Sequence, residues 1–191
     1  MPSRLATIPN VLTLLRLLLI PVFVVATLHN RFTVALVVFV SAALTDAVDG
    51  YLARRLNQRT RFGAIMDPAA DKLMMVAGYL VYTIHSAPYR LPEWLTFTVF
   101  IRDLLIALYA YLLYTRVHFS RFPPSAAGKT STVLQVVTLS FLIASNTPMR
   151  ILTAPFLRPL FWSTIALTLY SGFDYMRRAD RWLQALREET V

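Results

Sequence analysis

Long apolar stretches, separated by short polar connectors, make up most of the chain. A helix that crosses the roughly 30 Å of hydrocarbon in a bilayer needs about 20 mostly apolar residues, and each stretch is about that long. Backbone polar groups find no partner in lipid, so an open segment spans a membrane only as a helix. The pattern therefore predicts six spanning helices, over residues 9–28, 33–53, 66–86, 92–114, 127–145 and 151–176.

The connectors between these stretches are short and contain turn-forming residues. Asn30, Pro88, Pro123, Pro124 and Pro148 lie in four of them, and such residues favour turns. No linker is long enough to separate two domains, and the chain contains no internal repeat. We therefore predict one membrane-embedded, all-α domain over residues 1–191, built as a bundle of six transmembrane helices.

The composition agrees with a membrane protein and narrows its chemistry. Hydrophobic residues make up 57% of the 191 residues and charged residues 15%, with a mean hydropathy of +0.55. The formal net charge is +9, but in so apolar a chain basic residues serve topology and contact anionic head groups, so we expect no nucleic acid partner. Cysteine is absent, so a bound metal would need oxygen or histidine ligands.

The basic residues are distributed unequally between the two sides of a six-span topology. One side holds Arg31, Arg90 and Arg150. The other side holds Arg4, Arg54, Arg55, Arg59, Arg61, Arg116, Arg121, Lys129, Arg177, Arg178, Arg181 and Arg187. Because basic connectors stay in the cytoplasm, both termini and the second connector are predicted to be cytoplasmic. We expect residues 177–191 to form an interfacial helix, and the first stretch to remain in the mature protein because Arg16 interrupts it.

Four aspartates lie within 26 residues of otherwise apolar sequence: Asp46 and Asp49 in the second stretch, Asp67 and Asp71 in the third. Carboxylates within a membrane are costly and therefore functional by default. Spacings of three and four residues place each pair on one helix face, and two facing pairs repel each other unless cations lie between them. Oxygen ligands of this kind favour Mg²⁺, Mn²⁺ or Ca²⁺. The sequence thus predicts a two-metal site for phosphoryl transfer.

Small and basic residues surround these acids. Gly50 and Ala53 leave room beside the predicted metals, and Gly63 lets the backbone approach a ligand closely. The alternative interpretation is that all three residues only allow close helix packing. The Arg54 guanidinium is suited to a diphosphate, whereas the neighbouring Arg59 is more typical of a topology signal.

The spacing D-x2-D-G-x2-A-R-x8-G-x3-D-x3-D, present at every fixed position between Asp46 and Asp71, resembles the signature of the CDP-alcohol phosphatidyltransferases. The resemblance extends to residues 8–16 of the first stretch and to residues 128–130 of the fifth. It implies a membrane enzyme of six transmembrane helices, generally a homodimer, with a site that opens to the cytoplasm. The implied location is a membrane of the bacterial inner-membrane type.

The resemblance also implies a reaction and the residues that perform it. The phosphatidyl group of CDP-diacylglycerol passes to an alcohol with release of CMP, with two Mg²⁺ or Mn²⁺ ions held by Asp46, Asp49, Asp67 and Asp71. Asp71 also serves as general base toward the acceptor hydroxyl. The positions that match CDP-diacylglycerol contacts are Asn10, Thr13, Gly50, Ala53, Arg54, Thr60 and Gly63.

The identity of the acceptor depends on a few positions. Residues 8–13 and 60–72 look like the branch that contains phosphatidylglycerophosphate synthases and single-motif cardiolipin synthases. Tyr109, Ala110 and Ser131 stand where glycerol-3-phosphate enzymes of that branch carry basic residues, and a phosphate monoester would need those cations. We therefore favour phosphatidylglycerol as acceptor, with glycerol-3-phosphate as the alternative.

Four basic residues are candidates for binding the acceptor: Arg102, Arg116, Arg121 and Lys129. The alternative for Arg102, as for Arg16, is an internal ion pair, and Lys129 could simply extend toward the membrane surface. A small ion transporter is the competing functional class, since buried acids and arginines can line a conduction path. Such a path would spread ionisable groups through the membrane depth, whereas here they gather in two connected segments.

Overall fold

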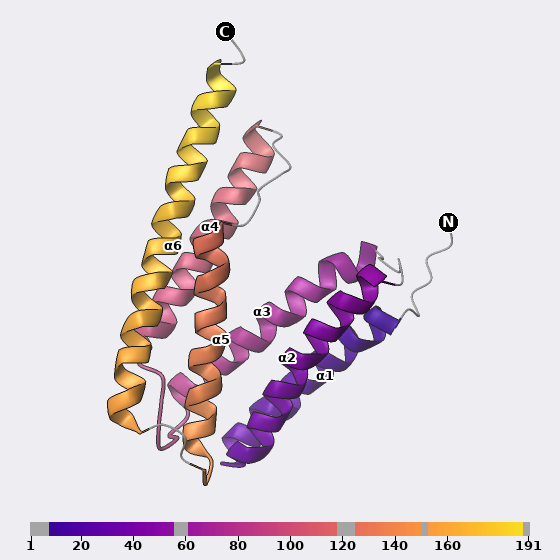
Figure 1. Cartoon of the computed structure of the whole chain (residues 1–191), viewed down its shortest axis with the longest axis vertical. Coiled ribbons are helices and arrows are strands. Elements are labelled where there is room, and N and C mark those ends of the chain that lie inside the picture. Colours follow the sequence, from indigo (N-terminus) through magenta and orange to yellow (C-terminus); the bar gives the residue numbers. More distant parts are fainter. Residues whose placement is uncertain (1–7, 56–60, 118–124, 150–152, 189–191) are drawn as a thin grey trace. The chain divides into compact units, whose positions relative to one another are not determined.

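The computed structural model describes residues 8–55, 61–117, 125–149 and 153–188. Within its helices the side chains of residues 8–10, 46–55, 61–65, 110, 112–114, 116–117 and 179–188 lie outside the description. The described chain forms six helices and no strand (Figure 1), which confirms the predicted all-α class. These are α1 (Ile8–Leu28), α2 (Phe32–Arg55), α3 (Arg61–Ile84), α4 (Glu93–Val117), α5 (Ala126–Asn146) and α6 (Ala154–Glu188).

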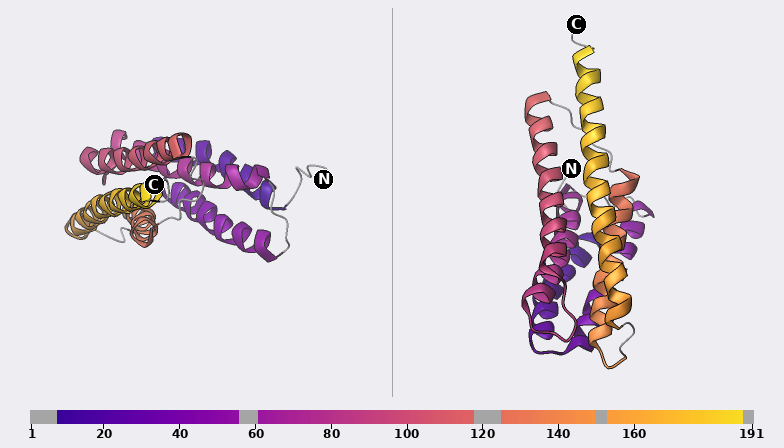
Figure 2. Two further views of the ribbon diagram at one scale, coloured as in Figure 1. Left: turned by 90° about the horizontal axis from the view of Figure 1, so that it is seen from above. Right: turned by 90° about the vertical axis from the view of Figure 1, so that its left-hand side faces the viewer.

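Two helices extend further than the apolar pattern predicts. Helix α3 begins at Arg61, five residues before the predicted start at residue 66, so Gly63 is helical. Helix α6 continues through the predicted interfacial tail to Glu188 as one helix of 35 residues (Figure 2). Residues 173–188 contain neither glycine nor proline, and Arg178 donates a hydrogen bond to Asp174 one turn earlier at 3.0 Å. Nothing in that segment ends a helix.

The chain forms two compact units, one of residues 1–91 with 139–153 and the other of residues 92–138 with 154–191. In the first unit α1 packs against both α2 and α3. An aromatic cluster lies at this contact, where Phe23 meets Phe39 and Tyr82 with ring centroids 5.8 and 6.4 Å apart. The small residues Ala35 and Ala42 are buried on α2 and allow the close helix approach that membrane bundles use.

The turn between α1 and α2 has a defined geometry. Asn30 has a φ of 58°, in the left-handed region that asparagine tolerates after a helix end. The Asn30 N–H donates to the Thr27 carbonyl and the Arg31 N–H to the Ala26 carbonyl, at 2.9 and 2.8 Å. These two bonds form a Schellman motif. The His85 Nε2 donates to the Asn30 side-chain oxygen at 3.0 Å, which ties this turn to the end of α3.

In the second unit α4 packs along α6. Trp94 stacks on Trp162 with centroids 5.0 Å apart, and Tyr109 meets the edge of Tyr175 at 6.3 Å. Aromatic pairs of these geometries add to the packing of large apolar side chains. They hold the two helices together at the start of α4 and again about four turns further along it.

Helices α5 and α6 are joined by buried hydroxyl and amide groups. Thr138 and Thr164 share a hydrogen bond of 2.6 Å. The Gln135 amide donates to Thr168 at 3.1 Å and to Ser131 at 3.3 Å. Hydrogen bonds between helices are a normal means of association in membrane proteins, where burial of apolar surface gives little driving force.

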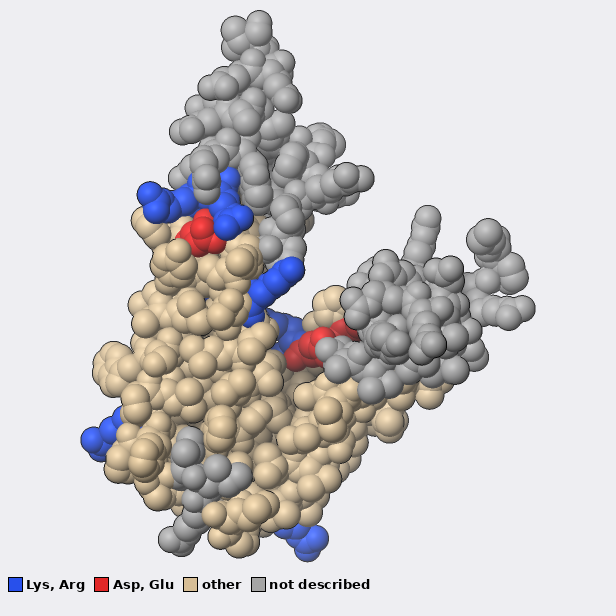
Figure 3. All heavy atoms as spheres, in the orientation of Figure 1, with Lys and Arg blue, Asp and Glu red and all other residues tan. Residues whose placement is uncertain are grey.

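Two described helical segments are long and apolar enough to cross a membrane, namely Val11–Leu28 of α1 and Ala126–Asn146 of α5. Many large apolar side chains also lie exposed, among them Leu18, Val37, Phe97 and Leu104, each at 60% or more. Figure 3 shows few charged side chains among the described atoms of the face it presents. An extensive exposed apolar surface of this kind is typical of a membrane contact.

Candidate active site

Helix α3 presents two of the four predicted acids. Asp67 and Asp71 are one helical turn apart, so they lie on the same face. The Asp67 side chain is partly buried, and the Asp71 side chain is 43% exposed. Both carboxylates are therefore partly covered by the protein and partly accessible to a ligand.

Helix α1 supplies a partner for each of these acids. Thr13 and Arg16 are both 1% exposed and stand three residues apart on α1. The Thr13 hydroxyl donates a hydrogen bond to Asp67 Oδ1, and Arg16 Nη1 donates to Asp71 Oδ1 at 2.5 Å. A buried guanidinium needs such a counter-charge, because desolvation makes an isolated charge expensive. The two contacts fix the register between α1 and α3.

Helix α2 carries the other two predicted acids. The backbone of Asp46, Asp49, Gly50 and Ala53 lies within α2 as predicted, and Arg54, just beyond the predicted stretch, is helical as well. Their side chains lie outside the described residues. Helix α2 packs on α1 and also contacts α3, so the three helices that carry the predicted site belong to one compact unit.

The remaining predicted substrate contacts fall partly outside the described residues. Asn10 lies on α1 and Gly63 on α3, while the Asn10 side chain and the whole of Thr60 lie outside the description. Thr13 is described, and its hydroxyl bonds to Asp67.

The described acids of the site offer oxygen ligands for a metal ion. Among the side chains that the structure describes, no three His, Asp or Glu residues are grouped closely enough to hold a metal ion. Asp67 and Asp71 supply two accessible carboxylates, which are hard oxygen donors of the type that Mg²⁺ and Mn²⁺ prefer. The described half of the predicted donor set therefore fits a hard divalent cation.

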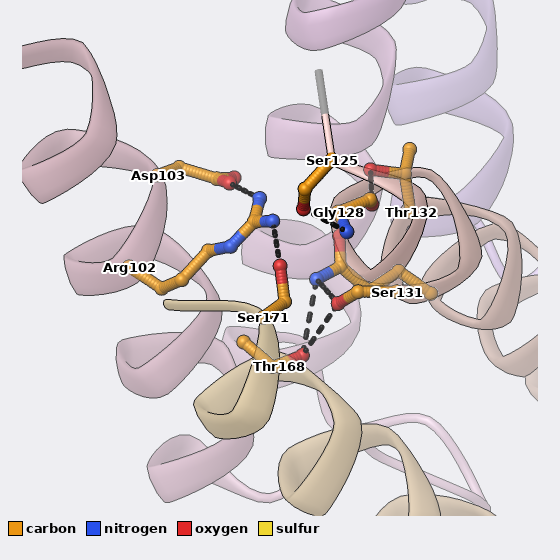
Figure 4. A network of polar contacts seen from close by, with 9 residues as sticks. Arg102, Asp103, Ser125, Gly128, Ser131, Thr132, Thr168 and Ser171 are labelled. Carbon is orange, nitrogen blue, oxygen red and sulfur yellow. Dashed lines mark hydrogen bonds and ion pairs between the residues drawn. The ribbon is translucent and has the colours of Figure 1, made fainter. Parts of the chain in front are cut away.

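The predicted acceptor residue Arg102 lies in a polar network of the second unit (Figure 4). Its Nη1 donates to Asp103 Oδ1 at 2.9 Å and its Nη2 donates to the Ser171 hydroxyl. The Arg102 and Asp103 side chains are only 12% and 13% exposed. The internal ion pair considered for Arg102 is therefore present. A Cβ atom on Gly128 would lie 3.3 Å from Arg102 Nη2, so glycine leaves space for the guanidinium.

The other three predicted acceptor residues are less connected to this network. Lys129 is exposed in the first turn of α5. Arg116 lies on α4, but its side chain is outside the description, as is the whole of Arg121. Arg102 thus lies within a hydrogen-bonded polar cluster, whereas Lys129 lies at the surface.

Sequence reasoning missed three polar positions on α6. Thr164, Thr168 and Ser171 follow one another at four and three residues, so they form one stripe along the helix. Each is at most 1% exposed and each contacts a polar group of α5 or α4. The helical spacing of these hydroxyls within an apolar segment could have indicated a buried polar stripe.

Comparison with known proteins gives a consistent result. Residues 6–170 match the family model described as CDP-alcohol phosphatidyltransferase. A probable phosphatidylglycerophosphate synthase of Mycobacterium tuberculosis is 31% identical, over 97% of this chain and 88% of that protein. A CDP-diacylglycerol–glycerol-3-phosphate 3-phosphatidyltransferase of Bacillus subtilis is 28% identical, over 90% of this chain and 94% of that protein. A putative cardiolipin synthase of Mycobacterium tuberculosis is 39% identical, over 68% of this chain and 61% of that protein.

Proposed function

The chain belongs to the CDP-alcohol phosphatidyltransferase family, and on that premise we propose that Asp46, Asp49, Asp67 and Asp71 form its catalytic centre. The protein is a membrane enzyme of phospholipid biosynthesis whose substrates are CDP-diacylglycerol and an alcohol, and its product is an anionic glycerophospholipid. The observation that carries the proposal is the paired contact from α1, in which Thr13 holds Asp67 and Arg16 holds Asp71.

We propose that the four aspartates bind divalent cations, Mg²⁺ or Mn²⁺, with two ions per site. When bound, such ions neutralise the diphosphate of the substrate and stabilise the leaving CMP. The support is the donor chemistry, because carboxylate oxygens suit these hard cations. The proposal is also supported by the location of both acid pairs, which lie on helices of one packed unit.

Asp71 is proposed as the general base. It takes the proton from the acceptor hydroxyl as that oxygen attacks the β-phosphorus, which carries the diacylglycerol. One phosphorus–oxygen bond forms to the acceptor, the bond to CMP breaks, and CMP leaves. The Arg16 contact at 2.5 Å holds the Asp71 carboxylate in a fixed orientation, which a base needs in order to reach a single hydroxyl.

The proposed CDP-diacylglycerol contacts gather on α1, the end of α2 and the start of α3. They are Asn10, Thr13, Gly50, Ala53, Arg54, Thr60 and Gly63. Because the Thr13 hydroxyl bonds to Asp67, we assign Thr13 the role of positioning that acid near the nucleotide. Arg54 is proposed to bind the diphosphate, since a guanidinium forms two parallel hydrogen bonds to such an anion.

Phosphatidylglycerol is the acceptor we favour, which makes the product cardiolipin. Ser131 is 1% exposed and bonds to Gln135, and Tyr109 packs on Tyr175. Both positions are thus used for packing and supply no cation for a phosphate monoester. Glycerol-3-phosphate is the second candidate, because two relatives that match 90% or more of this chain bear the names of enzymes that make phosphatidylglycerophosphate or use glycerol-3-phosphate. The candidate residues for either acceptor are Arg102, Arg116, Arg121 and Lys129.

For the membrane arrangement we propose that residues 1–191 form one domain with six spans. Both termini and the active site would face the cytoplasm of a bacterial inner membrane, because the basic connectors lie on that side. We also propose a homodimer, as the family resemblance implies. Cysteine-scanning accessibility would test the topology, and cross-linking in membranes would test the dimer.

The experiment that tests the reaction is CMP release by the purified protein in detergent with Mg²⁺ or Mn²⁺. Phosphatidylglycerol and glycerol-3-phosphate are offered separately with CDP-diacylglycerol. Release with phosphatidylglycerol alone would support the cardiolipin assignment, and release with glycerol-3-phosphate alone would replace it. Folded protein that releases no CMP with either acceptor would overturn both assignments.

A further inference from the structure

A hollow at the turn between α1 and α2 lies far from the acids. On α1, Arg16, which contacts Asp71, lies 12 residues before the helix end at Leu28, and at about 1.5 Å each these make roughly 18 Å along the helix axis. A ligand at this turn therefore cannot be the one that reacts at Asp71. Such a ligand would bind at the end of the first unit opposite the acids.

Two adjoining hollows meet at Arg31. One is an apolar groove of about 550 Å³ along α1 and α2, lined by Pro21, Val22, Val25, Ala26 and Val34 before it reaches His29 and Arg31. The other is a more polar hollow of about 410 Å³, in which Arg31 and Val34 recur beside Thr33, Asn146 and Thr147. The two together provide an apolar channel that ends at a cationic, hydrogen-bonding pocket.

The polar wall of this pocket is already hydrogen-bonded within the protein. The Asn146 amide accepts the Tyr89 N–H and donates to the Tyr89 carbonyl, both at 2.9 Å. The Thr147 hydroxyl donates to the Ala144 carbonyl at 2.6 Å. These bonds occupy the Asn146 amide and the Thr147 hydroxyl, and Arg31 supplies the positive charge of this hollow.

Arg31 keeps its charge available. Its side chain is exposed, the first turn of α2 contains no acidic residue, and no ion pair of the described residues involves it. The Schellman motif fixes its backbone. A guanidinium carried by an ordered backbone at the rim of an apolar groove is complementary to an anionic group that carries a hydrocarbon chain.

We propose that this surface binds a phospholipid with a net negative head group. One acyl chain lies in the groove on α1 and α2, and the phosphate contacts the Arg31 guanidinium in the adjoining hollow. This lipid is distinct from the reacting substrates, and it sits at the opposite end of α1 from them. Helix α1 is apolar enough to span a membrane, so lipid chains would surround the groove in any case. What distinguishes the proposed site is its preference for an anionic head group.

Native mass spectrometry of the purified full-length chain tests this proposal. The protein is titrated with phosphatidylserine, an anionic lipid that is neither of the proposed substrates, or with phosphatidylcholine of the same acyl chains. We expect a preference of roughly tenfold for phosphatidylserine at one site, and its loss in Arg31→Gln, because one charge-assisted contact is removed. Arg31→Lys should retain most of the preference. Arg90→Gln is the matched control, since Arg90 is also exposed on a connector of the same unit.

A second pair of variants tests the groove itself. Val34→Trp would fill the channel and weaken the binding of both lipids, whereas Val37→Trp, on an exposed part of α2 outside the groove, should leave binding unchanged. CMP release should persist in Arg31→Gln, so a failure here is distinguishable from a failure of the proposed catalytic function. The proposal is overturned if Arg31→Gln keeps the full preference for phosphatidylserine, or if Arg90→Gln loses it equally.

Discussion

Arg16 on α1 donates a hydrogen bond of 2.5 Å to Asp71 on α3, across 55 residues of sequence. The guanidinium is 1% exposed, whereas the carboxylate is 43% exposed. In this ion pair the arginine is therefore buried within the helix bundle, whereas the aspartate remains accessible to a ligand. This asymmetry suits an acid that must be held firmly and still reach a substrate.

Asp71→Asn should abolish most turnover while the protein stays folded. The amide oxygen of asparagine can still accept the Arg16 hydrogen bond, but it cannot take a proton, so we expect CMP release to fall about 10²- to 10⁴-fold. The measurement is the rate of CMP release, with thermal melting and metal-dependent CDP-diacylglycerol binding as controls for folding. Retained activity would remove Asp71 as the base.

Arg16→Gln should lower the rate of CMP release by roughly 10- to 100-fold, because Asp71 loses the contact that orients it. The loss should appear in kcat more than in the KM for CDP-diacylglycerol. Arg16→Lys keeps a charge without the planar guanidinium and should recover part of the rate. Equal kinetics in Arg16→Gln and the unmodified enzyme would show that the ion pair serves folding alone.

Asp67→Ala should lose metal-dependent nucleotide binding, measured by titration calorimetry with CDP-diacylglycerol and Mg²⁺. Thr13→Val is the matched variant, because it removes the hydroxyl that bonds to Asp67 but keeps the carboxylate. We expect Thr13→Val to cost about 1 kcal/mol of stability and to weaken binding much less. Unchanged binding in Asp67→Ala would place the metal site elsewhere.

Gly78→Ala should destabilise the protein by about 1 to 3 kcal/mol through overpacking. An added Cβ would lie 2.5 Å from Leu139 Cδ2, far inside contact distance. Gly172→Ala is the control, since its Cβ would meet Arg102 Cγ at an ordinary 3.5 Å. Thermal melting of both variants in detergent should therefore separate them, and Gly78→Ala should cost less stability in a Leu139→Ala background than in the unmodified protein. Equal melting of the two glycine variants would contradict this packing.

Sequence reasoning predicted the helices well because apolar length and helix formation are tied together in a membrane. It placed α4 and α5 to within a few residues, but it divided α6 at residue 176 into a span and a separate interfacial helix because the sequence becomes polar there, although nothing there breaks a helix. It also identified Arg16 as a candidate for an ion pair without naming Asp71 as the partner. Contacts between residues 55 positions apart depend on how α1 and α3 pack, and that information is not contained in local spacing.

The Arg16–Asp71 pair also has a consequence for biogenesis. Translation at about 5 to 20 residues per second delivers Asp71 several seconds after Arg16, given the 55 residues between them. In the proposed topology α1 enters the bilayer during that interval with a guanidinium whose counter-charge has not yet been synthesised, at a cost of about 3 kcal/mol on insertion scales. The strongly apolar segment Val11–Leu28, with a mean hydropathy of 2.5, would offset that cost.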